Sequence, residues 1–330
     1  MSVVYRTSTP EDEAQIIDLL KRAWEGRPTT THFLQPELVR WKLWEPCVGW
    51  PESRSWVVDR DGRIVAHTAI WPVLTVETGD KEETIISTLD WASDPTNAGA
   101  GVSLLKRLMK TYDFTLCVGG SAMTQSILPR IGFGTVAEAV TWTRPLRPWH
   151  RIFQNPSVRG VKDLPGKLLW AQRPSKSVDR RWSAVPFDSK SADQPVPLGE
   201  HPQGYFDYLD RCPIARCLRF HILNEGRKVG WFALFVGRVQ ARLAGAWLVE
   251  PTAENWRVAF NLAQTAALKS THALEFIARS TAPAAAAGAE LAGMHVTKRE
   301  PVFLWPANRS ELPPLNYQLC DNDDVILNIV

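Results

Sequence analysis

Residues 90–109 read DWASDPTNAGAGVSLLKRLM, and this stretch decides how the whole chain is interpreted. An apolar run rich in β-branched residues, TIISTL at 84–89, leads into it and predicts a strand. Turn-forming residues follow, and Gly99 and Gly101 then open a segment whose apolar residues recur at helical spacing. Free N–H groups at such a helix start can hold a phosphate, and glycines let a ligand approach the backbone. The alternative is an ordinary turn between a strand and a helix.

The composition bounds the class of protein. Hydrophobic residues make up 45% of the 330 residues and charged residues 22%, which predicts a soluble globular chain of about two domains. The 38 basic and 35 acidic residues leave a net charge of +3, too balanced to indicate nucleic acid or an anionic membrane as a partner. The N-terminus soon turns polar, and no apolar run reaches the ~18 residues of a membrane span.

Cysteine and histidine spacing argues against metal sites and disulfides. The five cysteines are an odd number and contain no C-x-x-C pair, which favours a reducing compartment and hence the cytoplasm. The histidines show no metal-ligand spacing, so we expect no bound metal. No G-x-S-x-G elbow and no Walker loop occurs, which sets hydrolases and nucleoside triphosphatases aside.

The pattern of the first half predicts the order β-α-α-β-β-β-α-β-α-β. An antiparallel meander comes first, and βαβα units that need parallel pairing follow. The expected elements are a strand at 3–6, helices at 9–24 and 34–43, strands at 54–59, 63–76 and 83–91, a helix at 99–109, a strand at 114–118, a short helix at 121–128 and strand material at 131–146.

This order and the central loop together resemble the GNAT acetyltransferase superfamily over the first half of the chain. In that family the fourth strand ends in a bulge, and a Q/R-x-x-G-x-G/A loop holds the pyrophosphate of acyl-CoA. Residues 96–101, TNAGAG, fit this frame, and Gly132-Phe133 fits a later Gly-Phe motif. The resemblance implies that acetyl-CoA or another acyl-CoA is bound by Trp91, Ala92, Thr96, Asn97, Gly99, Ala100, Gly101 and Val102.

Two positions depart from the family's pattern. Thr96 stands where the family has Gln or Arg, so a side-chain contact to phosphate is missing, although the backbone amides remain. Leu128 stands where the family commonly has a tyrosine as general acid, and a leucine cannot protonate a thiolate. Either another group protonates the leaving thiol, or this half does not transfer acyl groups.

Two side chains are candidates for the chemistry itself. Acyl transfer to an amine requires a neutral amine, a polarised thioester carbonyl and alignment of the two. Asp90, beside the expected bulge, is either a general base or amine contact, or a carboxylate that organises the loop. His67, on the adjacent strand, is either a base near neutral pH or a packed histidine. Trp91 either lines the groove for the pantetheine arm or fills the core.

The second half repeats the order βββαβαβ. Its counterpart of the central loop reads VEPTAENW and has no Gly-x-Gly, so we assign it no CoA site. From the resemblance we expect an α/β fold (an α+β mixed sheet) of two tandem GNAT-like domains, each a mostly antiparallel sheet flanked by helices. The expected limits are 1–146 and 180–330, with a proline-rich linker at 147–179. An acidic cluster at 321–324 either binds a cation or is a solvated turn.

The predicted function is an acyl-CoA-dependent N-acyltransferase in which a small-molecule amine attacks the thioester directly. The fifteen tryptophans favour an amino sugar or a cell-envelope precursor as the acceptor. One alternative is a tandem GNAT transferase that takes its donor from aminoacyl-tRNA, against which the low net charge speaks. The other is a non-catalytic binding module, which Thr96 and Leu128 favour. The pattern leaves the oligomeric state open.

Overall fold

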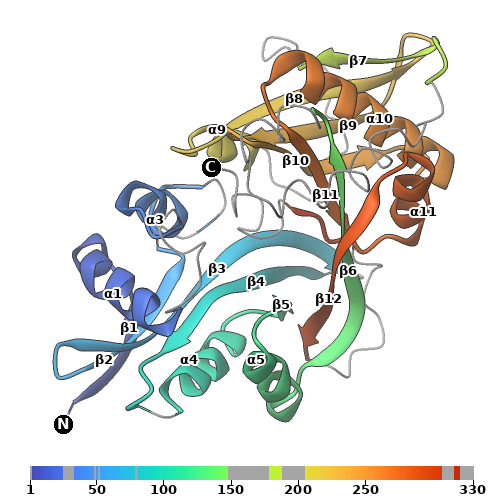
Figure 1. Cartoon of the computed structure of the whole chain (residues 1–330). Coiled ribbons are helices and arrows are strands. Elements are labelled where there is room, and N and C mark those ends of the chain that lie inside the picture. The colour runs from blue at the N-terminus through green and yellow to red at the C-terminus, as the bar shows by residue number, and fades with distance from the viewer. Residues whose placement is uncertain are drawn as a thin grey trace, which may run out of the picture.

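The strands of the described chain form one curved sheet (Figure 1). The computed structural model describes residues 2–24, 33–47, 50, 53–78, 81–97, 99–147, 178–187, 205–306 and 316–319. Most of the predicted linker at 147–179 and the acidic cluster at 321–324 lie outside the described residues. The mixed α/β class expected from the sequence is confirmed.

The elements of the first half match those expected from the sequence, with ends shifted by a few residues. Thr9 and Pro10 start the first helix as expected, because Pro suits a first turn and lacks only an N–H that the turn leaves unbonded. The elements are β1 (Val3–Thr7), η1 (Pro10–Asp12), α1 (Glu13–Ala23), α3 (Pro36–Leu43), β2 (Ser55–Arg60), β3 (Arg63–Thr78), β4 (Lys81–Ser93), α4 (Ala100–Met109), β5 (Phe114–Val118), α5 (Ala122–Ile127), η2 (Leu128–Ile131) and β6 (Gly134–Pro145).

The second half repeats this order of strands and helices. Its elements are β7 (Trp182–Pro186), α9 (Tyr205–Asp210), β8 (Arg216–Asn224), β9 (Arg227–Val236), β10 (Gln240–Leu248), α10 (Ala253–Ser270), β11 (Glu275–Ser280), α11 (Pro283–Leu291) and β12 (His295–Trp305). Each of β7–β12 therefore has a counterpart among β1–β6, in the same sequence order.

The two halves exchange their last strands. The strand order is β1-β2-β3-β4-β5-β12-β6-β11-β10-β9-β8-β7, so β12 lies between β5 and β6, and β6 lies between β12 and β11. Val302 and Leu304 of β12 pair with Val118 and Leu116 of β5. If each strand is replaced by its counterpart, the order reads the same from either end. Each half thus completes its part of the sheet with a strand of the other half. The expected domain limits, 1–146 and 180–330, stay predictions, and β6 and β12 each pair with strands on the other side of those limits.

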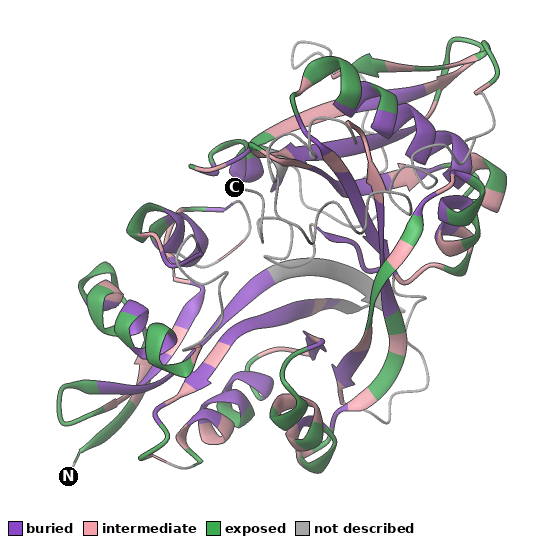
Figure 2. Ribbon diagram, viewed as in Figure 1, coloured by how far each residue is buried: buried purple, intermediate pink, exposed green. Residues whose placement is uncertain are grey.

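Helices cover both faces of the sheet. On β2, Val57 packs with α1 and α3, whereas its neighbour Val58 packs with Leu104 of α4, so these helices lie on opposite faces. On β9, Ala233 shares the cluster of α3 and α9, whereas Phe232 packs with α10. Figure 2 shows buried central strands and exposed outer surfaces on α1, α4 and α10. One face therefore carries α1, α3 and α9, and the other carries α4 and α10.

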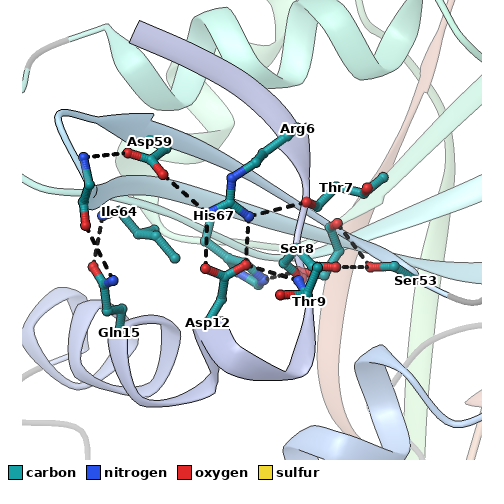
Figure 3. Close-up of polar contacts among 12 residues, drawn as sticks. Arg6, Thr7, Ser8, Thr9, Asp12, Gln15, Ser53, Asp59, Ile64 and His67 are labelled. Carbon is teal, nitrogen blue, oxygen red and sulfur yellow. Dashed lines mark hydrogen bonds and ion pairs between the residues drawn. The ribbon is translucent and has the colours of Figure 1, made fainter. Parts of the chain in front are cut away.

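An arginine fixes the first helix to the sheet (Figure 3). Arg6 of β1 donates to Asp12 Oδ2 at 2.6 Å and Oδ1 at 2.9 Å, and to Asp59 Oδ2 at 3.1 Å. Asp12 Oδ2 also accepts from the Thr9 amide at 2.9 Å, which caps the helix start. The Arg6 hydrogen bond lowers the pKa of the Asp12 carboxyl. The start of α1 is thereby tied to β1 and β2.

A buried arginine joins α3 of the first half to α9 of the second. Arg54 has 0% exposure and donates to the carbonyls of Trp41, Lys42 and Glu45 at the end of α3, where a cation is favoured by the helix dipole. Its Nη2 also donates to the Tyr208 hydroxyl at 3.1 Å. The Trp41 and Tyr208 rings stack at 4.7 Å. The two halves therefore share a core on this face as well as a sheet.

Candidate functional site

Strands β4 and β5 separate in the middle of the first half. They pair in parallel from Ile85 and Phe114 to Ser87 and Leu116, and the pairing ends there. At the point of separation, Thr88 Oγ1 lies 2.7 Å from the Sγ of Cys117 on β5. The edge of β4 beyond Ser87 is consequently not covered by β5, and its backbone groups on that side are not used in the sheet.

A bulge interrupts β4 just beyond this point. His67 of β3 pairs with Ala92, and Ala69 pairs with Leu89, so two residues of β4 stand opposite Thr68 alone. The first of the two, Asp90, has a φ of 51°, in the left-handed region that a non-glycine residue seldom adopts. A bulge leaves one residue outside the hydrogen-bonded ladder. The site therefore contains the bulged fourth strand that the resemblance implies.

Helix α4 begins directly against the strand that follows the bulge. Gly99 caps the helix with a φ of 83°, and the Trp91 indole Nε1 donates to the Gly101 carbonyl at 2.8 Å. A Cβ on Gly101 would lie 3.1 Å from Trp91 Nε1 and 3.2 Å from the Ser93 side chain. The first-turn amides have no acceptor within the helix, and the first turn carries no acidic side chain. This helix start can therefore receive an anion.

A buried carboxylate shapes the loop between β4 and α4. Asp94 accepts from Thr96 Oγ1 at 2.7 Å, from Arg22 at 2.9 Å and from Arg63 at 2.7 Å. The Thr96 hydroxyl, followed by the Arg22 guanidinium, holds the pKa of Asp94 well below its usual range. The Thr96 hydroxyl proton is therefore directed at Asp94 rather than outward. A role of Thr96 in binding the cofactor stays a prediction that rests on its position in the loop.

The other predicted cofactor residues lie along the same path. The side-chain carbonyl of Asn97 accepts from Arg60 Nη1 at 2.5 Å, and its backbone carbonyl accepts from the Ala100 amide at 3.1 Å. Ala92 is buried on β4, and Val102 is half-buried in the first turn of α4. The structure thus brings the predicted residues together at one end of β4, with their roles still predicted.

The two predicted catalytic side chains belong to one buried network. The Asp90 carboxylate forms an ion pair with Lys42 of α3, and these side chains are 3% and 1% exposed. His67 has 0% exposure, with Nδ1 3.0 Å from the Asp90 carbonyl oxygen and Nε2 2.9 Å from Ser55 Oγ. Burial lowers the pKa of His67 to about 4, so the ring is neutral and Nδ1–H donates to the carbonyl. A role of either side chain as a base stays a prediction, and these contacts favour a positioning role.

Acid should weaken the fold through His67. Its pKa of about 4 lies below the 6.5 expected of an unfolded chain, so the unfolded state binds the proton more tightly. The contribution of neutral His67 to the free energy of unfolding is complete above pH 6.5. As the pH falls toward 4, about 3 kcal/mol of the free energy of unfolding is lost. Urea unfolding of wild type and of His67→Gln at pH 7 and pH 4.5 measures this. The loss should be smaller in His67→Gln and unchanged in His272→Gln, at an exposed histidine; equal losses in all three proteins would contradict it.

Lys42 was not predicted from the sequence. It lies four residues after the buried Leu38 on α3, and residues four apart share a face of a helix. A lysine on the apolar face of a short helix is therefore a signal of a buried partner, and here the partner is Asp90. The sequence gives no indication of which carboxylate that partner is.

The position at which the family commonly has its general acid is occupied by a buried core residue, Leu128. Leu128 has 0% exposure and packs with Phe133 and Phe303 beneath α5 and η2. Cys117 is the nearest thiol to the separation of β4 and β5, and burial raises its pKa to about 12. Its thiol therefore stays protonated at neutral pH, which makes it a poor nucleophile.

The matching helix start in the second half is closed. At the start of α10, Thr252 Oγ1 accepts from the Asn255 amide at 3.2 Å, and Glu254 adds a negative charge in the first turn. Helix α11 packs against this turn so closely that a Cβ on Gly288 would lie 2.5 Å from Trp256 Cβ. The side-chain cap, the acid and the packing distinguish this helix start from that of α4, and the lack of a CoA site in this half, expected from the missing Gly-x-Gly, stays a prediction.

Within the described ranges, no group of three or more His, Cys, Asp or Glu side chains is arranged to hold a metal ion. None of the helices described is both long and apolar enough to cross a membrane.

Comparison with known proteins identifies the class of fold. Residues 4–117 match the family described as Acetyltransferase (GNAT) domain, which assigns the segment containing the bulge and α4 to the GNAT acetyltransferases. No curated protein matches the chain in sequence. The predicted resemblance to the GNAT superfamily is thereby confirmed.

Solved structures share the fold across nearly the whole chain. A putative acetyltransferase from Pyrococcus horikoshii is 12% identical, with a TM-score of 0.56 over 98% of this chain and 92% of that one. A tandem GNAT protein from the clavulanic acid biosynthesis pathway is 12% identical, with a TM-score of 0.56 over 94% of this chain and 100% of its own. Saccharomyces cerevisiae N-myristoyltransferase, determined with bound myristoyl-CoA and inhibitors, is 12% identical, with a TM-score of 0.59 over 92% and 80%. The tandem GNAT architecture is the fold of this chain.

Proposed function

We propose that the protein is an acyl-CoA-dependent N-acyltransferase that acylates the amine of a small molecule by direct attack on the thioester. The observation that carries the proposal is the start of α4, where Gly101 packs on Trp91 beside the bulge. A helix start without a side-chain cap, a bulged strand and two separating strands occur there together, and the three could hold one extended thioester between them.

The geometry suggests how an acyl-CoA would lie. Its pyrophosphate would be held by the first-turn amides of α4 at Gly101 and Val102, where the dipole favours an anion. Its pantetheine arm would use the edge of β4 beyond Ser87, which β5 leaves open. The thioester would then lie beside the bulge, where a backbone amide outside the ladder can polarise the carbonyl. The similar fold of N-myristoyltransferase, determined with myristoyl-CoA, supports this assignment.

The reaction requires no covalent enzyme intermediate. The amine nitrogen forms a bond to the carbonyl carbon, the carbon–sulfur bond breaks, and the proton lost by the amine balances the thiolate that becomes CoA thiol. The protonated state of Cys117 at neutral pH supports direct transfer over transfer through that thiol. The acceptor would be a small amine, with amino sugars and cell-envelope precursors the first classes to screen.

The cysteines support a cytoplasmic setting for the proposed reaction. The described ones, Cys47, Cys117, Cys212 and Cys217, are free. Free thiols are typical of a reducing compartment, which is also where acyl-CoA would be supplied.

Calorimetric titration with acetyl-CoA tests the proposal. Wild type should bind, and Gly101→Glu should weaken binding by roughly 100-fold or more, because it places bulk against Trp91 and a carboxylate at the anion site. Thr111→Glu, at an exposed position just beyond the far end of α4, adds the same charge and should bind like wild type. Lack of binding at millimolar acetyl-CoA would rule the proposal out, as would unchanged affinity of Gly101→Glu. Release of CoA thiol in the presence of candidate amines then identifies the acceptor class.

A further inference from the structure

We propose that Lys42, Asp90 and His67 are positioning residues that hold the bulge of β4 in its reactive shape, without themselves exchanging protons with substrate. The inference rests on the proposed function, because the bulge matters only if its backbone polarises a thioester. Asp90, which the sequence predicted as a base, takes a different role here. The backbone conformation of Asp90, rather than its negative charge, supports the reaction.

The first observation is the conformation of Asp90. Its φ of 51° is one of three positive φ values at non-glycine residues in the described chain. The other two, Asp61 and Glu225, precede glycines in hairpin turns, where such a conformation is common. Asp90 instead lies inside a strand, where a left-handed residue persists only if surrounding contacts enforce it.

The second observation is that two separate contacts hold this residue. Its carboxylate is paired with Lys42, and its backbone carbonyl accepts from His67 Nδ1 at 3.0 Å. One contact fixes the side chain from α3, and the other fixes the following peptide from β3. Together they determine both ends of the residue, and hence the direction of the amide that follows it.

The histidine is in turn held by the strand next to it. Ser55 Oγ donates to His67 Nε2 at 2.9 Å, and the Ser55 carbonyl accepts from the Ser8 amide at 2.9 Å. Ser53 Oγ donates to the Ser8 carbonyl at 2.8 Å and also lies 3.3 Å from the Ser55 carbonyl (Figure 3). His67 therefore has a fixed tautomer and orientation, set by β2.

The lysine links the bulge to the second half. Its Nζ lies 3.8 Å from the centroid of the Phe33 ring, and its own carbonyl accepts from Arg54 at 3.1 Å. Arg54 also contacts Tyr208 of α9. The position of α3, and through it the position of the Lys42 ammonium, thus depends on how the two halves pack.

The same contacts argue against proton transfer by this network. A general base must reach the proton that it removes, directly or through one water. The Asp90 carboxylate is 3% exposed and already paired with an ammonium, and both nitrogens of His67 are engaged within the protein. A pair of buried charges is seldom retained for stability alone, so a role in fixing a local geometry accounts for it better.

Two matched double variants separate backbone shape from charge. Lys42→Met with Asp90→Asn removes both charges, and asparagine tolerates a positive φ. Lys42→Met with Asp90→Val removes the same charges with a side chain of similar size, but a β-branched residue strongly disfavours that φ. We expect the Asn variant to lose roughly 10-fold in kcat, because the contact with Lys42 is gone while the tolerated φ and the contact with His67 remain. The Val variant should lose about 100-fold or more, so that the barriers of the two variants differ by about 1.4 kcal/mol or more.

Three further readouts accompany kcat. Both variants should bind acetyl-CoA nearly as wild type does, because the anion site at α4 is intact, and circular dichroism should show both folded. The pH profile of kcat/KM should keep its shape in the Asn variant. Equal loss of kcat in both variants, or loss of a limb of that profile, would overturn the inference and make Asp90 a base. Failure of wild type to bind acetyl-CoA would instead overturn the proposed function, and this inference with it.

Discussion

A chain that ends after residue 146 should not fold, because the sheet of its half would lack a central strand. In the full protein β12 fills the place between β5 and β6. Val302, Phe303 and Leu304 of β12 are buried against the residues of the first half. Without β12, β5 would present an open edge, β6 would have no neighbour in its own half, and the clusters beneath them would be exposed to water. Urea unfolding followed by circular dichroism should show no cooperative transition for residues 1–146.

Co-expression of the two pieces provides the control. Residues 1–146 and 147–330, produced as separate chains, should assemble one to one, because each supplies the strand that the other lacks. The assembled pair should unfold cooperatively and bind acetyl-CoA. A cooperative transition in residues 1–146 alone, close to that of the full chain, would contradict this account of the fold.

Replacing Arg54 by methionine should destabilise the whole protein by about 3 kcal/mol or more. Arg54 donates to three carbonyls at the end of α3 and to the Tyr208 hydroxyl, all at 3.1 Å or less. Methionine fills similar space but donates nothing, so buried carbonyls would lose their partners. Urea unfolding with linear extrapolation gives the change in the free energy of unfolding.

Two further variants make this test specific. Arg54→Lys should recover little, because an ammonium cannot reach the planar set of acceptors that the guanidinium reaches. Arg227→Met, at an exposed arginine in a hairpin, should change stability by less than about 0.5 kcal/mol. If Arg54→Met cost no more than Arg227→Met, the buried hydrogen bonds would not stabilise the contact between α3 and α9.

The elements could be predicted from the sequence, whereas the partners of the strands could not. The limits expected for the strand at 114–118 agree with the structure, and those for the helix at 99–109 agree to within one residue, because apolar runs and Gly act locally. The exchange of β6 and β12 was not foreseen. Periodicity specifies which face of a strand is buried but not which strand lies beside it.

In the candidate site, too, the local features could be predicted from the sequence, whereas the contacts between distant residues could not. Gly99 and Gly101 were recognised from their spacing, and the structure gives each a physical need, a positive φ and a close approach to Trp91. The contact of Thr96 with Asp94, two residues away, belongs to a local turn and follows a known pattern. The pairing of Lys42 with Asp90 depends on where α3 comes to lie, which no local pattern encodes.

Because β12 belongs in the sheet of the first half, that half cannot complete its sheet until the end of the chain has been synthesised. A ribosome that has released β5, which ends at Val118, must still add 187 residues before β12 is complete at Trp305, which takes roughly 10 to 40 s at cellular elongation rates. Throughout that interval one edge of β5 in the first half has no partner strand. Folding during translation therefore cannot proceed half by half from the N-terminus, and the nascent first half is the species that chaperones would need to shield.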